Sequence, residues 1–344
     1  MKAAIYNPYL DSLGGGERYA ISVAKAFSDI GYKVNIQWKN DQIKPRLEKR
    51  FGIDLAGIDF IENINKGDGY DICFWVSDGS IPLLHSRFNI LHFQIPFANV
   101  NGKTLLNKMK LIRINKIVCN SKFTKKIIDE EFGLNSIVIY PPVPVAEIKS
   151  RKKENIILFV GRFSQLKQVK HQDILIDYFK KFFDKYSPDW RLILAGGSEV
   201  GSEEYVGFLR KKAEGYPICI QESPSFSQIK ELYGKAKIFW TASGFGVDPA
   251  QEPDKVEHFG IALVESMAAG CIPFAYKAGG HEEIITHGVN GFLWEDGKQL
   301  LSYFLALIND SKKLKEISNK AKVDSKIYEY ERFAKQFQAL VVKR

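Results

Sequence analysis

Strand-like and helix-like segments alternate along this 344-residue chain, and that alternation limits its fold more than any other feature. Alternation of this kind is typical of parallel β-sheets whose connecting helices cover the faces. In the first half we expect strands at 2–6, 33–38, 71–76, 89–93, 116–119 and 136–140. In the second half we expect them at 155–160, 191–195, 218–221, 237–240, 272–276 and 291–293. The sequence therefore predicts two Rossmann-like α/β domains.

A plausible linker separates the two series of strands. Pro141, Pro142 and Pro144 end the first series, and a charged stretch at 147–154 follows them. Stiff prolines followed by solvated charge suit a linker, and the chain length suits two domains of ordinary size. We therefore expect an N-terminal domain over 1–146, a second domain over 147–325 and a C-terminal helix within 326–344. Neither domain has G-x-G-x-x-G in the context that dinucleotide binding requires, so NAD is not supported.

The composition is that of a globular protein with a full core, since 45% of the residues are hydrophobic and 26% are charged. No apolar run approaches the length of a membrane span. The first residues enter a predicted strand directly, so we expect no signal peptide. The four cysteines are far apart and lie in or beside apolar runs, which predicts reduced core residues rather than disulfides or a zinc site. We therefore expect a cytoplasmic protein.

A strongly basic stretch at 103–126 contains eight Lys or Arg residues and no acid. Apolar residues are interleaved with these cations, namely Leu105, Leu106, Met109, Leu111 and Ile112. The pattern is that of a basic amphipathic helix, which predicts peripheral contact with an anionic membrane. Nucleic acid is a competing partner for such a patch. The chain has no recognition-helix, RRM or zinc-finger pattern, so we expect no nucleic-acid binding; a merely solvated face is the other alternative.

Two glutamates eight residues apart, Glu257 and Glu265, flank the start of a predicted helix at 260–269. A loop glycine before a helix leaves backbone N–H groups and the positive end of the helix dipole for a phosphate. Glu265 lies about one and a half turns into the helix, which is too far in for a cap. A ribose diol beside the phosphate would give this carboxylate a partner. The plainer alternative is a surface helix with two unrelated glutamates.

The segment 257–265 resembles the E-x7-E signature of family 4 retaining glycosyltransferases, and the segments 279–285 and 288–294 continue the family pattern in order. The resemblance implies the GT-B fold, in which two Rossmann-like domains face each other across a cleft. A C-terminal helix, here about 326–342, returns to the first domain in that fold. The resemblance also implies transfer of a hexose from a GDP- or UDP-linked sugar, with retention of configuration, to a glycan or lipid-linked acceptor.

The same resemblance assigns roles around the two glutamates. Glu257 would contact hydroxyls of the transferred sugar, and Glu265 would hold the ribose. The amides that follow Phe259 and Gly260 would meet phosphate oxygens. The other donor-binding residues expected in this half are His258, Ile261 and, at a strand end, Gly197.

Two cations are expected on the diphosphate, where they would stabilise the charge that builds on the leaving nucleotide. Arg162 follows the first strand of the second half and is one of them. Lys170 is favoured as the other because of its place before the next predicted helix. Lys167 has the commoner distance from Arg162, so both lysines stay open.

Two features of the first half complete the expected site. In the family, a pattern like Gly14-Gly15-Gly16-Glu17-Arg18 faces the sugar and the diphosphate, and on that basis we assign donor binding to Gly15 and Gly16. A helix is expected to follow at 19–27. His92 resembles a histidine whose backbone or ring meets the transferred sugar; the alternative is a buried, hydrogen-bonded core histidine. We expect the catalytic residues to be Glu257, His92, Arg162 and Lys170.

We expect neither a metal nor a cofactor, with the nucleotide-diphosphate sugar as a co-substrate. Family members generally need no metal, and the chain has no suitable D-x-D motif. Within the same fold, the alternatives are a sugar-nucleotide epimerase and a phosphorylase, for which no pyridoxal-phosphate lysine is identified. A non-catalytic protein that binds sugar nucleotides is the remaining alternative.

Overall fold

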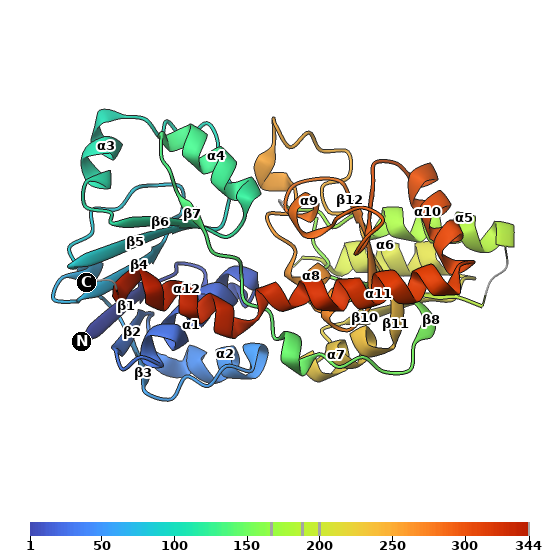
Figure 1. Ribbon diagram of the computed structural model, residues 1–344, viewed down its shortest axis with the longest axis horizontal. Coiled ribbons are helices and arrows are strands. Elements are labelled where there is room, and N and C mark those ends of the chain that lie inside the picture. Colours follow the sequence, from blue (N-terminus) through green and yellow to red (C-terminus); the bar gives the residue numbers. More distant parts are fainter. Residues whose placement is uncertain (166–167, 187–188, 199–200, 343–344) are drawn as a thin grey trace. The chain divides into compact units, whose positions relative to one another are not determined.

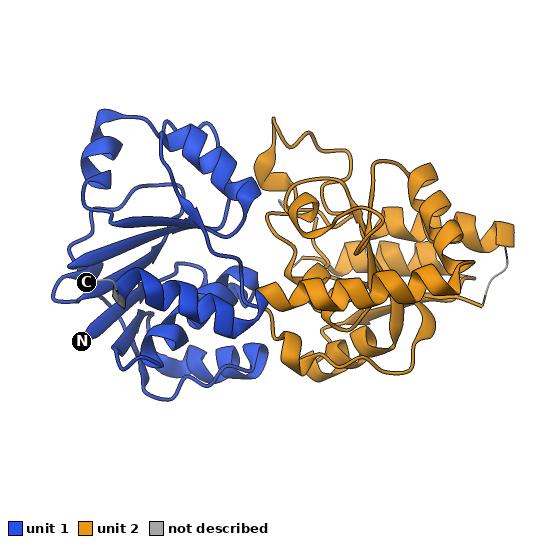
Figure 2. Cartoon of the chain, viewed as in Figure 1, with its two compact units in different colours: residues 1–142, 328–344 blue, residues 143–327 orange. Residues whose placement is uncertain are grey.

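The structure is a computed structural model that describes residues 1–344 except 166–167, 187–188, 199–200 and 343–344. The chain forms two compact units, which Figure 2 colours separately. Unit 1 comprises 1–142 and 328–344, and unit 2 comprises 143–327. These divisions lie close to the predicted positions after residues 146 and 325.

In its described part, unit 1 contains a seven-stranded parallel sheet with the order β3-β2-β1-β4-β5-β6-β7 (Figure 1). The strands are β1 Lys2–Tyr6, β2 Lys33–Gln37, β3 Ile58–Ile61, β4 Ile72–Val76, β5 Phe88–Phe93, β6 Lys116–Cys119 and β7 Ile137–Val138. β3 was not predicted from the sequence. The strand order reverses between β1 and β4, which is the Rossmann arrangement.

Helices cover both faces of this sheet, as Figure 1 shows. α1 (Gly15–Ser28), α2 (Lys44–Phe51) and α12 (Tyr330–Val342) lie on one face, and α3 (Leu105–Leu111) and α4 (Lys122–Phe132) lie on the other. Successive residues of β1 serve opposite faces, since Ala3 and Ile5 join the larger core cluster while Ala4 joins a separate one. This alternation follows from the period-two geometry of a strand.

The C-terminal helix α12 packs on unit 1, as the sequence predicted. The hydroxyl of Tyr330 donates to Oδ2 of Asp29 at 2.8 Å, and Nε2 of Gln338 donates to the backbone oxygen of Ala26 at 3.1 Å. Phe333 lies edge-on to the Tyr19 ring of α1, with 5.0 Å between ring centroids. The last segment of the chain is therefore part of the core of the first domain.

Unit 2 contains, among its described residues, a six-stranded parallel sheet with the order β10-β9-β8-β11-β12-β13. The strands are β8 Glu154–Val160, β9 Arg191–Gly196, β10 Ile218–Glu222, β11 Ala236–Thr241, β12 Ile272–Tyr276 and β13 Phe292–Trp294. Each was predicted to within a residue at either end. The order reverses between β8 and β11, and ligands of such sheets bind outside the carboxyl ends of the strands at this switch point.

The helices of unit 2 are α5 Gln172–Tyr186, α6 Glu203–Ala213, α7 Phe226–Lys235, α8 Ile261–Ala268, α9 His281–Ile284, α10 Gly297–Ile308 and α11 Ser311–Ser325. Aromatic residues from several elements fill the core, with Phe182 of α5 and Trp240 of β11 both packed edge-on to Phe304 of α10. Short 3-10 helices occur at Leu10–Ser12, Asp41–Ile43, Asn65–Gly67, Val145–Glu147, Pro253–Lys255 and Lys326–Tyr328.

In the parts of the chain that the structure describes, no helix has the length and apolar character needed to cross a bilayer. Cys73, Cys119 and Cys271 are buried free thiols, as predicted, but Cys219 is exposed. Cys219 lies on β10, the edge strand beside β9, in which no residue is fully buried. The prediction of a core residue was wrong for this cysteine.

Candidate functional site

The switch point of unit 2 brings several predicted site residues together. β8 ends at Val160 and leads into Gly161 and Arg162, and the neighbouring β9 ends at Gly196. A Cβ atom on Gly196 would lie 1.8 Å from the backbone oxygen of Gly161, so only glycine allows the two strand ends to approach this closely. Gly197, the next residue, has no neighbouring atom within 4 Å of where a Cβ would be, so its surface is open to a ligand.

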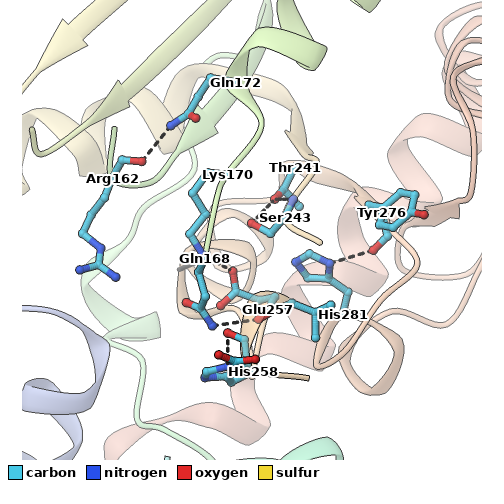
Figure 3. Close-up of polar contacts among 12 residues, drawn as sticks. Arg162, Gln168, Lys170, Gln172, Thr241, Ser243, Glu257, His258, Tyr276 and His281 are labelled. Carbon is cyan, nitrogen blue, oxygen red and sulfur yellow. Dashed lines mark hydrogen bonds and ion pairs between the residues drawn. The ribbon is translucent and has the colours of Figure 1, made fainter. Parts of the chain in front are cut away.

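The centre of the site is an ion pair between two residues that are far apart in the sequence. Nζ of Lys170 lies 2.9 Å from Oε2 of Glu257, and the two side chains are only 12% and 20% exposed (Figure 3). Arg162 is exposed on the loop after β8, and its side chain runs in the same direction as that of Lys170 in Figure 3. The structure therefore brings together Glu257 and Lys170, two of the predicted catalytic residues. Lys167 lies outside the described residues.

Glu257 is held ionised. Burial alone would raise the pKa of its carboxyl, but Lys170, His281 and His258 oppose that effect, Lys170 most strongly, and the pKa is lowered to about 2. Burial lowers the pKa of His258 to about 4 and also lowers the pKa of His281, despite the opposing field of Glu257. At neutral pH the site therefore contains a carboxylate and two neutral imidazoles beside Lys170.

Two glutamines fix the loop that carries Lys170. The side-chain amide of Gln172, the fully buried first residue of α5, donates to the backbone oxygen of Arg162 at 2.8 Å. The Tyr205 hydroxyl donates to Oε1 of Gln172 at 3.1 Å. Gln168 donates to the backbone oxygen of Val256, next to Glu257, at 2.8 Å. The loop after β8 is thus tied to α5, to α6 and to the segment that carries the carboxylate.

Two glycines pack against the backbone of Glu257, and His281 follows them. A Cβ atom on Gly279 would lie 2.2 Å from the backbone oxygen of Glu257, and one on Gly280 would lie 2.4 Å from Cα of Phe259. The amide of Gly280 donates to the Glu257 oxygen at 2.7 Å. Nδ1 of His281 lies 2.8 Å from the backbone oxygen of Tyr276, and because a carbonyl only accepts, this nitrogen carries the proton. Gly279 and Gly280 therefore pack against the backbone of the segment that begins at Glu257, and His281 lies close enough to act on its carboxylate.

Helix α8 places the second glutamate and offers backbone amides. Gly260 precedes α8 with φ of 111°, a left-handed conformation that favours glycine. The first hydrogen bonds to its carbonyl come from Leu263 and Val264. The amides of Ile261 and of its neighbour Ala262 are therefore in the first turn, where a backbone N–H has no helical carbonyl to bind. Such N–H groups favour the binding of an anion. Both residues are partly exposed.

Glu265 is 7% exposed and lies on α8. Its Oε2 accepts a hydrogen bond of 3.0 Å from the hydroxyl of Tyr233, which is fully buried on α7. Glu265 thus lies on the helix whose first turn carries the Ile261 amide, as the sequence predicted, and a neighbouring helix orients its carboxylate.

The glycines predicted to bind the donor in unit 1 have structural roles of their own. The predicted helix at 19–27 begins earlier, at Gly15, because the carboxylate of Glu17 accepts from the amide of Gly14 at 2.7 Å and caps the helix. A Cβ atom on Gly16 would lie 2.1 Å from Oε1 of Gln94, so a larger residue here would have to displace the end of the Gln94 side chain. Gly15 is exposed at the N-terminus of α1. These residues belong to unit 1, whereas the residues described above belong to unit 2.

The structure does not support His92 as a catalytic residue. Its ring is fully buried and stacks on Tyr19 with 4.1 Å between centroids, and Nδ1 lies 3.1 Å from the backbone oxygen of Val118. Its own backbone oxygen accepts from the amide of Ser77 at 2.8 Å. Burial lowers the pKa of His92 to about 3. The ring, including Nε2, is therefore buried in the core under α1, which favours the alternative of a core histidine.

Sequence reasoning missed four residues of the site, namely Gln168, Gln172, Tyr233 and His281. His281 lies within the family motif at 279–285, and that motif could have indicated it. The two glutamines and Tyr233 act through contacts between distant segments, and no local pattern indicates them. Among the described residues, no group of three or more His, Cys, Asp and Glu side chains is arranged to hold a metal ion.

The chain is similar in sequence and in fold to known proteins. The family model described as "Glycosyl transferases group 1" matches residues 145–324. An uncharacterized glycosyltransferase of Methanocaldococcus jannaschii is 27% identical, over 96% of this chain and 93% of that protein. A GDP-Man:Man(3)GlcNAc(2)-PP-Dol alpha-1,2-mannosyltransferase of Dictyostelium discoideum is 26% identical over 66% of this chain, which is 46% of its own length. Among solved structures, Anabaena Alr3699/HepE in complex with UDP has a TM-score of 0.76 over the full length of both chains at 18% identity, which is a similarity of fold.

Proposed function

The chain belongs to the glycosyl transferases group 1 family and has its GT-B fold of two Rossmann-like domains, and from that premise we propose that it is a retaining hexosyltransferase that uses a nucleotide-diphosphate sugar. The observation that carries the proposal is the partly buried pair of Lys170 and Glu257 in the same domain as Glu265 and the start of α8. This arrangement combines a cation and backbone amides for an anion with carboxylates for hydroxyl groups.

The diphosphate is proposed to bind between the side chains of Arg162 and Lys170 and the amides of Gly260 and Ile261. Cations and oriented amides stabilise the negative charge that develops as the nucleotide leaves. These groups together balance the charge without a divalent ion, so the proposed reaction is independent of metal.

The two carboxylates are proposed to bind hydroxyl groups. Glu265, oriented by Tyr233, accepts hydrogen bonds from the ribose diol. Glu257, which is ionised at neutral pH, accepts them from the transferred sugar. Hydrogen bonds to an ionised acceptor are stronger than those between neutral groups. Both carboxylates are therefore expected to contribute to the affinity for the donor.

The proposed reaction is a same-face substitution at the anomeric carbon. The acceptor oxygen forms a bond to that carbon while the bond from the carbon to the phosphate oxygen breaks. The acceptor's proton passes to an oxygen of the leaving diphosphate, so the configuration is retained and no protein nucleophile is needed. The chain's own residues hold the diphosphate and the sugar in place for this step.

The relatives suggest the range of donors and acceptors. The name of the Dictyostelium relative gives GDP-Man and Man(3)GlcNAc(2)-PP-Dol as substrates, and the Anabaena structure contains UDP. We therefore propose a GDP- or UDP-linked hexose as donor and a glycan or lipid-linked acceptor. We also propose a cytoplasmic location, which the free thiols at all four cysteines support.

The test is a panel of GDP- and UDP-linked mannose, glucose and galactose, with nucleotide release measured with and without candidate acceptors. We expect release that depends on acceptor, and its loss in Glu257→Gln. Glu316→Gln, an exposed residue of α11, is the matched control and should retain full activity. Conversion of the donor's sugar without any acceptor would identify an epimerase instead. Donor binding without turnover across the panel would favour a non-catalytic binding protein.

A further inference from the structure

Helix α3 is unusual in that none of its seven residues is buried. Four large apolar side chains on it or next to it are open to solvent, with exposed fractions of 75% for Leu105, 61% for Leu106, 59% for Met109 and 82% for Ile112. An amphipathic helix of a globular protein normally turns its apolar residues toward the core. We call these four side chains the α3 surface.

The α3 surface is exposed because of the way the helix is attached to unit 1. The carboxylate of Glu131, on α4, accepts from the amides of Asn99, Val100 and Gly102 at 2.9–3.1 Å and fixes the segment that leads into α3. Thr104 caps the helix by accepting from the amide of Asn107. Figure 1 shows α3 beside α4 on the sheet face opposite α1 and α12. The apolar side chains are therefore held outward by an ordered attachment.

Cations lie among and beside the residues of the α3 surface along the chain. The basic stretch 103–126 does not form one amphipathic helix. It is divided among α3, β6 and the start of α4, and α3 is its amphipathic part. The cations nearest to the α3 surface in sequence are Lys103, Lys108, Lys110, Arg113 and Lys116, and no acid occurs between 103 and 126. Of the acids on the neighbouring α4, Asp129 pairs with Lys125 and Glu131 accepts from three amides, while Glu130 is exposed.

We propose that the α3 surface inserts into an anionic lipid bilayer and holds unit 1 at the membrane. Exposed apolar side chains interleaved with lysine and arginine match the boundary between acyl chains and anionic headgroups. A second copy of the chain fits less well, because a self-complementary contact would set the cations of one copy against those of the other. Nucleic acid would pair with the cations but gives the four apolar side chains no partner.

The test uses the full chain and vesicles of phosphatidylcholine alone or mixed equally with phosphatidylglycerol, with sedimentation as the readout and no donor or acceptor present. Its result is therefore independent of the proposed transferase activity. The wild type should bind only the anionic vesicles. Binding should fall several-fold between 0.01 and 0.15 M salt, since the Debye length shortens from about 30 to about 8 Å.

Two sets of variants separate insertion from simple charge attraction. Replacing Leu105, Leu106, Met109 and Ile112 with Gln should weaken vesicle binding at least tenfold, because each inserted side chain contributes transfer free energy. The cation variant Lys108→Gln, Lys110→Gln, Arg113→Gln should weaken it by a similar factor. The control variant Val323→Gln, Ile327→Gln changes exposed apolar residues of unit 2 and should bind normally. The melting temperature of each variant should match that of the wild type.

Three results would overturn the proposal. Absence of binding to anionic vesicles at low salt would leave the α3 surface without a lipid partner. Binding that survives the four glutamines but not the cation variant would mean surface attraction without insertion, or a nucleic-acid site if duplex DNA competes. A dimer in sedimentation equilibrium that the four glutamines convert to a monomer would assign the surface to a second copy.

Discussion

Replacement of Lys170 by methionine tests the central ion pair most directly. The substitution keeps the length and most of the volume of the side chain but removes the charge that faces Glu257. Both side chains are well shielded, so the carboxylate would remain where water reaches it poorly and without its closest cation. We expect unit 2 to lose stability, because an uncompensated buried charge is costly.

The magnitude follows from the pKa of Glu257. A pKa of about 2 in place of 4.5 corresponds to about 3 kcal/mol in favour of the ionised carboxyl in the folded state. That shift is the net result of burial and three neighbouring basic side chains, among which Lys170 acts most strongly. Lys170→Met should therefore reduce the free energy of unfolding at pH 7 by an amount on the order of 3 kcal/mol, near the lower end of the range for a broken buried pair. The double variant Lys170→Met, Glu257→Gln removes both charges and should recover part of that loss.

The same reasoning gives the pH dependence. The pKa of Glu257 is lower in the folded state, so its stabilising contribution is complete above pH 4.5 and disappears as the pH falls from 4.5 to 2. In Lys170→Met, burial acts on Glu257 without its main opposing cation, so the folded variant takes up this proton at a higher pH than the wild type. The difference in unfolding free energy should therefore narrow as the pH falls from the pKa of Glu257 in the variant to about 2. Urea unfolding followed by tryptophan fluorescence, at a series of pH values, measures it.

Lys33→Met provides the matched control. Lys33 pairs with Asp59 across an exposed surface of unit 1, with 3.7 Å between the charged atoms. Its loss should change stability little, because exposed pairs are well screened. The reasoning is refuted if Lys170→Met unfolds like the wild type at pH 7, or if its deficit stays constant from pH 7 to pH 2.

The remaining predictions concern ligands. Glu265→Gln should weaken donor binding by about ten- to hundredfold in calorimetric titration with unchanged circular dichroism, because it removes a charge-assisted acceptor; unaltered affinity would exclude the ribose role. Tyr233→Phe should cause a smaller loss of the same kind, since it removes only the group that orients Glu265. Arg162→Ala should weaken binding of a nucleoside diphosphate more than binding of the nucleoside, and equal losses for both would remove the diphosphate contact. Transfer should survive excess EDTA, and activity that is lost and then restored by magnesium or manganese would reveal a metal requirement.

Much of the fold could be predicted because buried parallel strands leave strong local signals. The apolar runs at 155–160 and 272–276 each became a strand of unit 2. β3 was missed because it is a half-exposed edge strand, with Asp59 exposed in its middle. The start of α1 was placed too late because three glycines resemble a turn, whereas the side chain of Glu17 caps a helix that begins among them.

The site was predictable only where its residues follow each other closely. The sequence predicted Glu257 before a helix and Glu265 within it, and in the structure Glu257 precedes α8 and Glu265 lies on it. Lys170 lies 87 positions from Glu257, and Tyr233 lies 32 positions from Glu265, so no local pattern reports these contacts. For His92 the sequence left a site residue and a core histidine both open, because a strand pattern alone does not say which face a given side chain joins. In β5 that face is the core under α1, which favours the core histidine.

The pair of Lys170 and Glu257 also links stability to the proposed chemistry. Without a donor, each charge satisfies the other in a place that water reaches poorly. In the proposed complex the diphosphate becomes the counterion of Lys170, so part of the attraction between Lys170 and Glu257 must be given up when the donor binds. The carboxylate then needs new hydrogen-bond donors, and hydroxyl groups of the transferred sugar provide them.

A nucleoside diphosphate without a sugar would pair with Lys170 and leave Glu257 without a replacement partner. The exchange therefore favours the complete nucleotide sugar over the bare nucleotide, and it couples recognition of the sugar to binding of the diphosphate through a single contact.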